Sequence, residues 1–284
     1  MSRYQKSEVR GQKSDGGRGG REIEEKGHRS GQGGRCEVSI VIPAYNEEHR
    51  IGASLDRLVE YCRAHLPGHE IICVDDGSED RTWKRITEPE RGTSLRGIRF
   101  TRNRGKGYAV KQGMLAATGR YRFFTDADLP YRMDSFHGAM QVFENSDCEL
   151  VVGSRDLPGA SAGLKRGIFR HLAGRLFSAM VSRLVNIGPY DTQCGFKGFT
   201  AHAAEEIFSR LSVCGYTFDV EIFVLAHSLN LKICEIPVTL VSHAGSSVRL
   251  TSAPFRMLAE LAKITWRERA GSREQGAGGR EQRA

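Results

Sequence analysis

Short apolar runs alternate with longer segments of helical periodicity through the first half of the chain. Residues 37–43 form a β-branched run bounded by a proline, the pattern of a buried parallel strand. Residues 47–66 place apolar side chains at helical spacing, and Pro67-Gly68 ends that segment. The same alternation predicts further strands over 70–75, 96–100, 121–125 and 150–152, with helices beginning near 78 and covering 105–118 and 134–146. This order predicts a doubly wound, mostly parallel α/β sheet over about 36–155.

The second half of the chain has a less regular pattern. It predicts two helices within 200–229 and strands near 232–241. Amphipathic helices are expected over 165–186 and 254–268, each with arginines among its apolar positions. Such helices either lie in a membrane interface or pack on the domain itself, and the sequence leaves both readings open.

Both ends of the chain are expected to be disordered tails. Residues 1–35 hold nine Lys or Arg, five Asp or Glu and nine glycines, a composition that cannot form a core. Residues 269–284 are similar, which leaves one domain over 36–268. The chain has a net charge of +8, and basic tails can attract nucleic acid or anionic lipid. Because no basic stripe interleaved with aromatic residues is present, no nucleic-acid partner is expected.

Membrane spans and secretion are also not expected. The chain has no run of 18 apolar residues, and residues 1–35 contain no apolar segment of a signal peptide. Its seven cysteines include no C-x-x-C pair and mostly lie in apolar runs. We therefore expect buried thiols in a reducing cytoplasm and no zinc site.

Polar clusters follow the predicted strands, where ligands bind in sheets of this kind. In Asp126-Ala-Asp128, an extended backbone would turn both carboxylates to one side, where they could share a divalent ion and a nucleotide diphosphate. Hard oxygen ligands favour Mg²⁺ or Mn²⁺. The alternative for this segment is an ordinary polar turn.

Two further clusters favour nucleotide binding. Asp75 and Asp76 end the second strand, and one of them could bond a base or ribose, while Ser78 could cap the next helix. Lys106 lies in a Gly-rich basic loop before a helix, which suits an anion at the helix N-terminus, although an ordinary loop explains it too.

Residues 153–155 end in an arginine, which suits forked contact with a phosphate. Residues 191–197 form a compact polar segment that packing alone does not explain. Within it, Cys194 has no nearby histidine and is not expected to be a nucleophile. Asp219 and Glu221 lie in a predicted helix and are expected to hold a loop rather than touch substrate.

Six motifs in order make the chain resemble family 2 glycosyltransferases of the GT-A fold. The closest resemblance is to the branch of dolichyl-phosphate glucosyltransferases and dolichyl-phosphate mannose synthases, and it spans about 37–267. The motifs are Pro43-Ala-Tyr-Asn-Glu47, Asp75-Asp-Gly-Ser78, Gly105-Lys-Gly107, Asp126-Ala-Asp128, Gly153-Ser-Arg155 and Asp191-Thr-Gln-Cys-Gly-Phe-Lys197.

The resemblance implies inverting transfer of a hexose from a nucleotide sugar to a polyprenyl (dolichyl or undecaprenyl) phosphate at a membrane surface. By that resemblance, the metal ligands are Asp126 and Asp128, and the catalytic residues are Asp128 and Arg155. The acceptor phosphate would be held by Arg155, Arg175 and Ser178. The donor nucleotide would be held by Pro43, Tyr45, Glu47, Asp75, Asp76, Lys106 and Asp126.

The loop at 103–114 and the segment 236–246 resemble those of the glucosyltransferase side of this branch, and that resemblance implies UDP-glucose as the donor. The alternatives are a GDP-mannose-dependent mannose synthase, a soluble family 2 transferase with a non-lipid acceptor, and a nucleotide-binding regulator without catalysis. Pro130 stands where mannose synthases can carry a Gln that joins the metal, so only two protein ligands are implied. The Q-x-x-R-W signature of processive synthases is absent, and no polymerase is expected.

Overall fold

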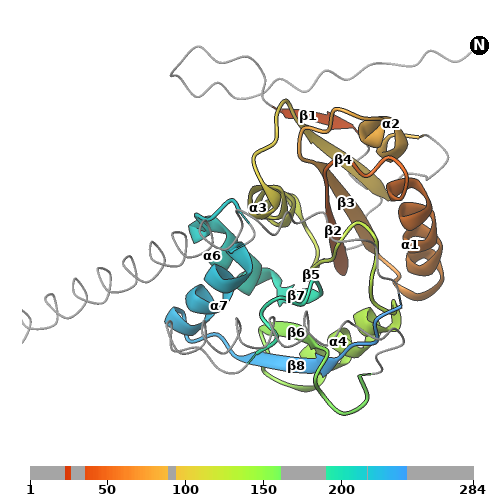
Figure 1. Ribbon diagram of the computed structural model, residues 1–284. Helices are drawn as coiled ribbons and strands as arrows, with labels where there is room; N and C mark the ends of the chain where they lie inside the picture. Colours follow the sequence, from red (N-terminus) through yellow and green to blue (C-terminus); the bar gives the residue numbers. More distant parts are fainter. Residues whose placement is uncertain (1–22, 27–35, 89–93, 161–189, 216, 242–284) are drawn as a thin grey trace, which may run out of the picture.

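The protein folds around one eight-stranded mixed sheet with helices on both faces (Figure 1). The computed structural model describes residues 23–26, 36–88, 94–160, 190–215 and 217–241. The strand order is β1-β4-β3-β2-β5-β7-β6-β8. The strands are β1 Ile23–Lys26, β2 Val38–Ala44, β3 His69–Asp75, β4 Leu95–Phe100, β5 Tyr121–Phe124, β6 Leu150–Ser154, β7 Lys197–Thr200 and β8 Ile233–Pro237.

The sheet is parallel at its centre and is interrupted by one reversed strand. Strands β4, β3, β2 and β5 are parallel neighbours, and β6 pairs with β8 in parallel. Between β5 and β6 runs β7, which is antiparallel to both, and β1 is antiparallel to β4 at one edge. The expectation of a doubly wound, mostly parallel sheet is confirmed.

Helices cover the two faces because successive side chains of each strand point to opposite sides. In β2, Ile40 and Ile42 join the core on one face, whereas Val41 joins the core on the other. The first face is covered by α1 (Ile51–His65), α2 (Thr82–Ile86) and α4 (Asp134–Asn145). The second is covered by α3 (Lys106–Ala116), α6 (Ala201–Arg210) and α7 (Phe218–Ser228).

The structure differs from the sequence predictions in three places. Strand β7 was not expected, and β1 lies within the range 1–35 that was expected to be a tail. The helix expected to begin near Ser78 begins at Thr82. The predicted amphipathic helices at 165–186 and 254–268, and the tail at 269–284, lie outside the described residues.

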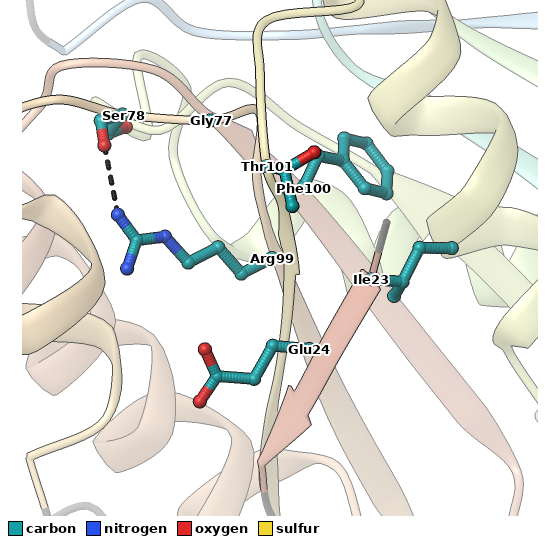
Figure 2. Close-up of a pocket in the computed structure, with 7 residues that line it drawn as sticks. All are labelled: Ile23, Glu24, Gly77, Ser78, Arg99, Phe100 and Thr101. Atoms are coloured by element: carbon teal, nitrogen blue, oxygen red, sulfur yellow. Dashed lines mark hydrogen bonds between the residues drawn. The ribbon is translucent and has the colours of Figure 1, made fainter. Parts of the chain in front are cut away.

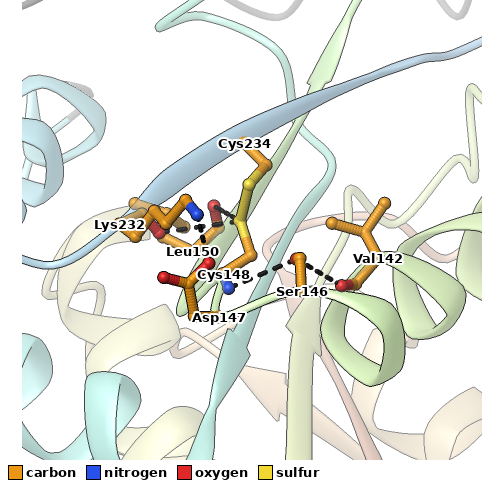
Figure 3. The surroundings of a disulfide bond; sticks show 7 residues. All are labelled: Val142, Ser146, Asp147, Cys148, Leu150, Lys232 and Cys234. Atoms are coloured by element: carbon orange, nitrogen blue, oxygen red, sulfur yellow. Dashed lines mark hydrogen bonds and ion pairs between the residues drawn. A yellow bond between two sulfur atoms is a disulfide. The ribbon is translucent and has the colours of Figure 1, made fainter.

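The expectation that all cysteines are thiols is wrong for two of the seven, because Cys148 and Cys234 form a disulfide (Figure 3). The two residues are 86 positions apart, but the parallel pairing of β6 with β8 brings their Cα atoms to 6.2 Å. An ion pair between Lys232 and Asp147 lies beside the disulfide. Such a pairing depends on topology and cannot be deduced from spacing along the chain.

Among the helices of the described residues, none is both long enough and apolar enough to cross a bilayer.

Candidate functional site

The carboxyl ends of β2, β3, β4 and β5 open onto one edge of the sheet, and each is followed by a backbone reversal. Each loop contains one residue in the left-handed region, namely Asn46 (φ 53°), Gly77 (71°), Gly105 (101°) and Leu129 (45°). Gly77 has no substitute, because a Cβ there would lie 2.3 Å from the backbone carbon of Arg102. Four sharp turns therefore keep the loops short at this edge.

Side-chain oxygens connect these loops to one another. The Asp76 carboxylate accepts hydrogen bonds from the backbone N–H groups of Arg104 (2.7 Å) and Gly105 (2.8 Å). The Ser78 hydroxyl accepts from the backbone N–H of Asn46 at 2.9 Å. Ser78 is thus not a helix cap as predicted, because it bonds the loop after β2 instead. These bonds make one rigid platform from three separate loops.

Asp75 lies at the end of β3 and is fully buried. Its Oδ1 accepts from the backbone N–H of Ser78 at 3.0 Å, and its Oδ2 lies 3.2 Å from the Nε of Arg99 without hydrogen-bond alignment. Burial raises the pKa of Asp75, while the bond from Ser78 and the Arg99 charge oppose that rise. Burial likewise raises the pKa of Asp76.

The Asp126-Ala-Asp128 segment follows β5 directly. The backbone N–H of Leu129 donates to the Asp126 carbonyl at 3.0 Å, which closes a turn around the two carboxylates. Lys106, the first residue of α3, places its Nζ 2.6 Å from Asp126 Oδ1. Burial and then the Asp126 charge raise the pKa of Asp128. The structure therefore brings three of the predicted residues into one charged cluster.

Glu47 adds a further carboxylate on the β2 side of this cluster. Its side chain accepts from Arg50 Nε at 2.7 Å, and its backbone N–H donates to the Thr82 hydroxyl at 2.7 Å. Burial raises the pKa of Glu47; the Arg50 charge opposes this, and the Asp128 carboxylate adds to it. Tyr45 is 42% exposed beside it, whereas Pro43 is buried within β2.

The charged cluster fits a divalent cation that is held partly by protein carboxylates and partly by the oxygens of a bound diphosphate. Burial and the neighbouring charge of Asp126 raise the pKa of Asp128, and a cation between the two carboxylates would relieve that repulsion. Within the described ranges, no group of three or more His, Cys, Asp or Glu side chains could hold a metal. Two protein carboxylates therefore suit an ion whose other ligands are diphosphate and water oxygens.

Arg155 follows β6 and is paired with Asp191 in a forked ion pair. The Nε–Oδ2 and Nη2–Oδ1 distances are both 2.6 Å. The hydrogen bonds to Asp191 outweigh burial and raise the pKa of Arg155. The guanidinium is fixed in direction by a carboxylate that the sequence analysis did not assign to it. Arg175 and Ser178, the other predicted acceptor residues, lie outside the described residues.

The polar segment at 191–197 forms one wall of the site. No role was predicted for this segment from the sequence. A Cβ on Gly195 would lie 2.2 Å from Asp126 Oδ2, so the bare backbone packs directly against that carboxylate. Cys194 is fully buried and burial raises the pKa of its thiol to about 11, as expected for a residue that is no nucleophile. The polar composition of segment 191–197, which packing does not explain, was the signal in the sequence that the segment belongs to the site.

Glu221 holds a loop, as expected. Its carboxylate accepts from the backbone N–H of Val213 at 2.7 Å and from the Ser212 hydroxyl at 2.6 Å. The same loop reaches the first turn of α3, where the Gly107 N–H donates to the Cys214 carbonyl at 2.9 Å. Glu221 thereby supports the helix that carries Lys106.

A cavity of about 510 Å³ lies on the outer side of this platform, between β1 and the loop after β3 (Figure 2). The Arg99 side chain extends across it and donates from Nη2 to the Ser78 carbonyl at 3.0 Å. The cavity shares Gly77 and Ser78 with the platform, but neither Asp126 nor Arg155 lines it. It is therefore not the place of the charged cluster.

The fold places paired carboxylates after a parallel strand and a lysine at a helix N-terminus, an arrangement that suits a nucleotide diphosphate with a divalent cation. Comparison with known proteins gives the family. Residues 39–208 match the model of glycosyl transferase family 2, and the chain belongs to this family.

The relatives include dolichyl-phosphate beta-glucosyltransferases. The protein of that name from Dictyostelium discoideum is 35% identical over 242 residues, covering 81% of this chain and 74% of the relative. The one from Saccharomyces cerevisiae is 34% identical, with coverage of 80% and 73%. The human one is 32% identical, with the same two coverages.

Solved structures agree with the GT-A fold. Glucosyl-3-phosphoglycerate synthase from Mycobacterium tuberculosis, crystallised with UDP, has a TM-score of 0.61 at 18% identity, covering 84% of this chain and 86% of that one. The same enzyme with Mn²⁺, UDP and phosphoglyceric acid has a TM-score of 0.57 at 18% identity, with coverage of 82% and 78%. The prediction of a GT-A glycosyltransferase is confirmed.

Proposed function

We propose that this glycosyltransferase moves glucose from UDP-glucose to a polyprenyl phosphate such as dolichyl phosphate. The observation that carries the proposal is the cluster of Asp126, Asp128 and Lys106 at the carboxyl edge of the sheet. The names of the relatives, which share about a third of its residues over most of their length, support this donor and this acceptor.

The donor diphosphate would lie at the charged cluster. Asp126 and Asp128 would hold Mg²⁺ or Mn²⁺, which when bound neutralises charge on the departing nucleoside diphosphate. Lys106 would contact the diphosphate from the N-terminus of α3, where backbone N–H groups favour an anion. Tyr45, Glu47 and the loop after β3 would hold the nucleoside.

The acceptor side needs orientation more than proton transfer. A phosphate monoester has a second pKa of about 6, so it is mostly dianionic at pH 7 and can attack without a general base. The forked pair with Asp191 would hold Arg155 in one orientation toward that phosphate. Arg175 and Ser178 complete the acceptor site in this proposal.

A polyprenyl-phosphate acceptor is a lipid, so the proposed reaction would take place at a membrane. We propose that the protein works at a membrane surface, on the cytoplasmic face, with segments 165–186 and 254–268 in the interface. Flotation with anionic liposomes at low and high salt tests this. Binding that weakens with salt supports the proposal, and no binding at low salt contradicts it.

The central test is a transfer assay. Purified protein is incubated with Mn²⁺, a polyprenyl phosphate, and radiolabelled UDP-glucose or GDP-mannose in parallel, and label in the organic phase is counted. Chelator-sensitive label from UDP-glucose alone is expected. Label from GDP-mannose alone would replace the donor, and no label from either, with UDP bound, would overturn the lipid acceptor.

A matched pair of variants tests whether transfer depends on the charged cluster of Asp126, Asp128 and Lys106. Asp128→Asn removes a proposed metal ligand and is expected to abolish transfer. Asp134→Asn removes an exposed carboxylate that pairs with Arg132 at the start of α4, and is expected to leave transfer unchanged.

A further inference from the structure

We infer that Lys197 is the positioning residue that holds the wall of the catalytic site against both the metal carboxylate and the acceptor arginine. The inference rests on the proposed function and adds a role that the donor and acceptor assignments do not include. Lys197 is fully buried at the first position of β7. A buried lysine without an obvious packing purpose calls for a physical explanation.

The position of Lys197 in the sheet is the first argument. In the register of the sheet it lies opposite Phe124 of β5 on one side and Val152 of β6 on the other. Phe124 is followed within two residues by Asp126, and Val152 within three by Arg155. Lys197 therefore lies between the two strand ends that carry the donor and acceptor chemistry.

The contacts of its ammonium group are the second argument. Lys197 Nζ lies 2.6 Å from Asp219 Oδ1, 2.7 Å from the Cys194 carbonyl and 3.2 Å from the Thr192 carbonyl. The three donors of an ammonium thus have three acceptors. Two of the three acceptors are carbonyls of residues 191–196, the part of the wall that precedes Lys197. The Lys197 side chain therefore ties residues 191–196 to the start of β7.

The face of this segment turned toward the site is the third argument. Asp191 forms the forked pair with Arg155, and Gly195 packs directly on the Asp126 carboxylate. The carbonyls that Lys197 binds, at positions 192 and 194, lie between these two contacts along the chain. Fixing the carbonyls therefore fixes both contacts, without Lys197 touching either substrate.

The negative partner of Lys197 is supplied by α7. Asp219 is itself mostly buried, and the Phe124 and Phe223 rings lie 5.3 Å and 5.8 Å from Lys197 Nζ. An ion pair inside such aromatic surroundings is screened little by solvent, so its geometry is tightly held. The pair therefore fixes the position of Lys197 Nζ, and with it the two carbonyls that Lys197 binds.

The test compares three variants. Lys197→Met removes the tether but leaves Asp219 buried without its cation, and could fail to fold. The double variant Lys197→Met, Asp219→Leu removes both charges, so no unpaired charge is left buried, and Mn²⁺ binding and transfer can still be measured on a folded protein. Arg122→Met is the matched control, because Arg122 is a buried cation that also bonds two carbonyls, of Gly119 and Met114, and one carboxylate, of Glu205.

Arg122 lies at the amino end of β5, away from the charged cluster. If Lys197 positions the wall, the double variant loses Mn²⁺ affinity, measured by electron paramagnetic resonance with UDP present, by about tenfold or more. Its kcat falls by a similar factor and its KM for polyprenyl phosphate rises. Arg122→Met lowers the melting temperature but leaves all three quantities unchanged.

Mn²⁺ affinity, kcat and KM within twofold of the wild type in a folded double variant would overturn the inference. So would equal losses in Arg122→Met, because they would show a general effect of stability. The Mn²⁺ measurement does not depend on the acceptor. If the wild type transfers no glucose, the proposed function fails, while the binding comparison still decides the role of Lys197.

Discussion

Replacing Gly195 by alanine tests the contact between segment 191–196 and the carboxylate of Asp126, a proposed metal ligand. The added Cβ would lie 2.2 Å from Asp126 Oδ2 and 2.8 Å from its Cγ. Carbon and oxygen atoms that are not bonded rarely come closer than about 3.2 Å, so the carboxylate must retreat by about 1 Å. The group that moves is the end of a side chain, and the fold can therefore accommodate the change.

The functional cost is expected to be much larger than the structural cost. A misplacement of about 1 Å at a reacting centre can lower a rate by about 100-fold, and here it moves a proposed metal ligand. We expect Gly195→Ala to lower kcat by about that factor and to raise the Mn²⁺ concentration for half-maximal activity. The melting temperature should change by only a few degrees.

The assay is glucose transfer over a Mn²⁺ titration, together with a thermal melt. Gly138→Ala is the control, because nothing lies within 4 Å of a Cβ at Gly138 in α4. That change should leave transfer unaltered and stabilise the fold by about 0.5–1 kcal/mol. Wild-type kcat and Mn²⁺ dependence in Gly195→Ala would refute the reasoning that this contact places Asp126.

Three further predictions concern the charges and the covalent link. Asp128→Asn should abolish transfer yet raise the melting temperature of the metal-free protein at pH 7, because burial and Asp126 raise the pKa of Asp128 and its ionisation opposes folding. That gain should disappear on acidification below its unfolded pKa of about 3.9, where both states are protonated; a constant gain in melts across pH would contradict this. Ellman titration of the denatured protein should find five thiols before reduction and seven after, and removing the disulfide by Cys148→Ser should cost about 2–5 kcal/mol in urea unfolding; seven thiols without reduction would contradict the link. Glu221→Gln should destabilise the fold by about 1–3 kcal/mol through its bonds to residues 212–213, and an unchanged urea midpoint would contradict its role in holding that loop.

The sequence predicts the parallel half of the fold well because each of its elements has a clear period. Strands such as 37–43 and 70–75 are continuous apolar runs, and the helices between them show one apolar face. The polar clusters that follow these strands are found together at one edge, as the rule for such sheets predicts. Asp126, Asp128 and Lys106 were therefore identifiable before their distances were known.

Strand β7 could not be predicted because its four residues, Lys197–Thr200, carry no strand pattern. It contains a glycine and begins with a buried lysine, so it reads as loop rather than strand. The antiparallel pairing of β7 with β5 and β6 joins residues far apart in the sequence, and so does the ion pair between Asp191 and Arg155. For the same reason the polar segment at 191–197 was noticed in the sequence but not given a role.

The reversed direction of β7 has a consequence for the order in which the molecule can assemble. Among the described strands, β6 pairs only with β7 and β8, so it has no partner in the sheet until residues 197–200 have been synthesised. A nascent chain ending near residue 160 would hold β1 and the four parallel strands β4, β3, β2 and β5, with β6 unattached. The free edge of β5 and both edges of β6 would be exposed to other chains. The parallel strands that end in the charged cluster and the strand that ends at Arg155 are therefore not separable folding units, because β7 joins them only after residues 197–200 have been inserted between β5 and β6.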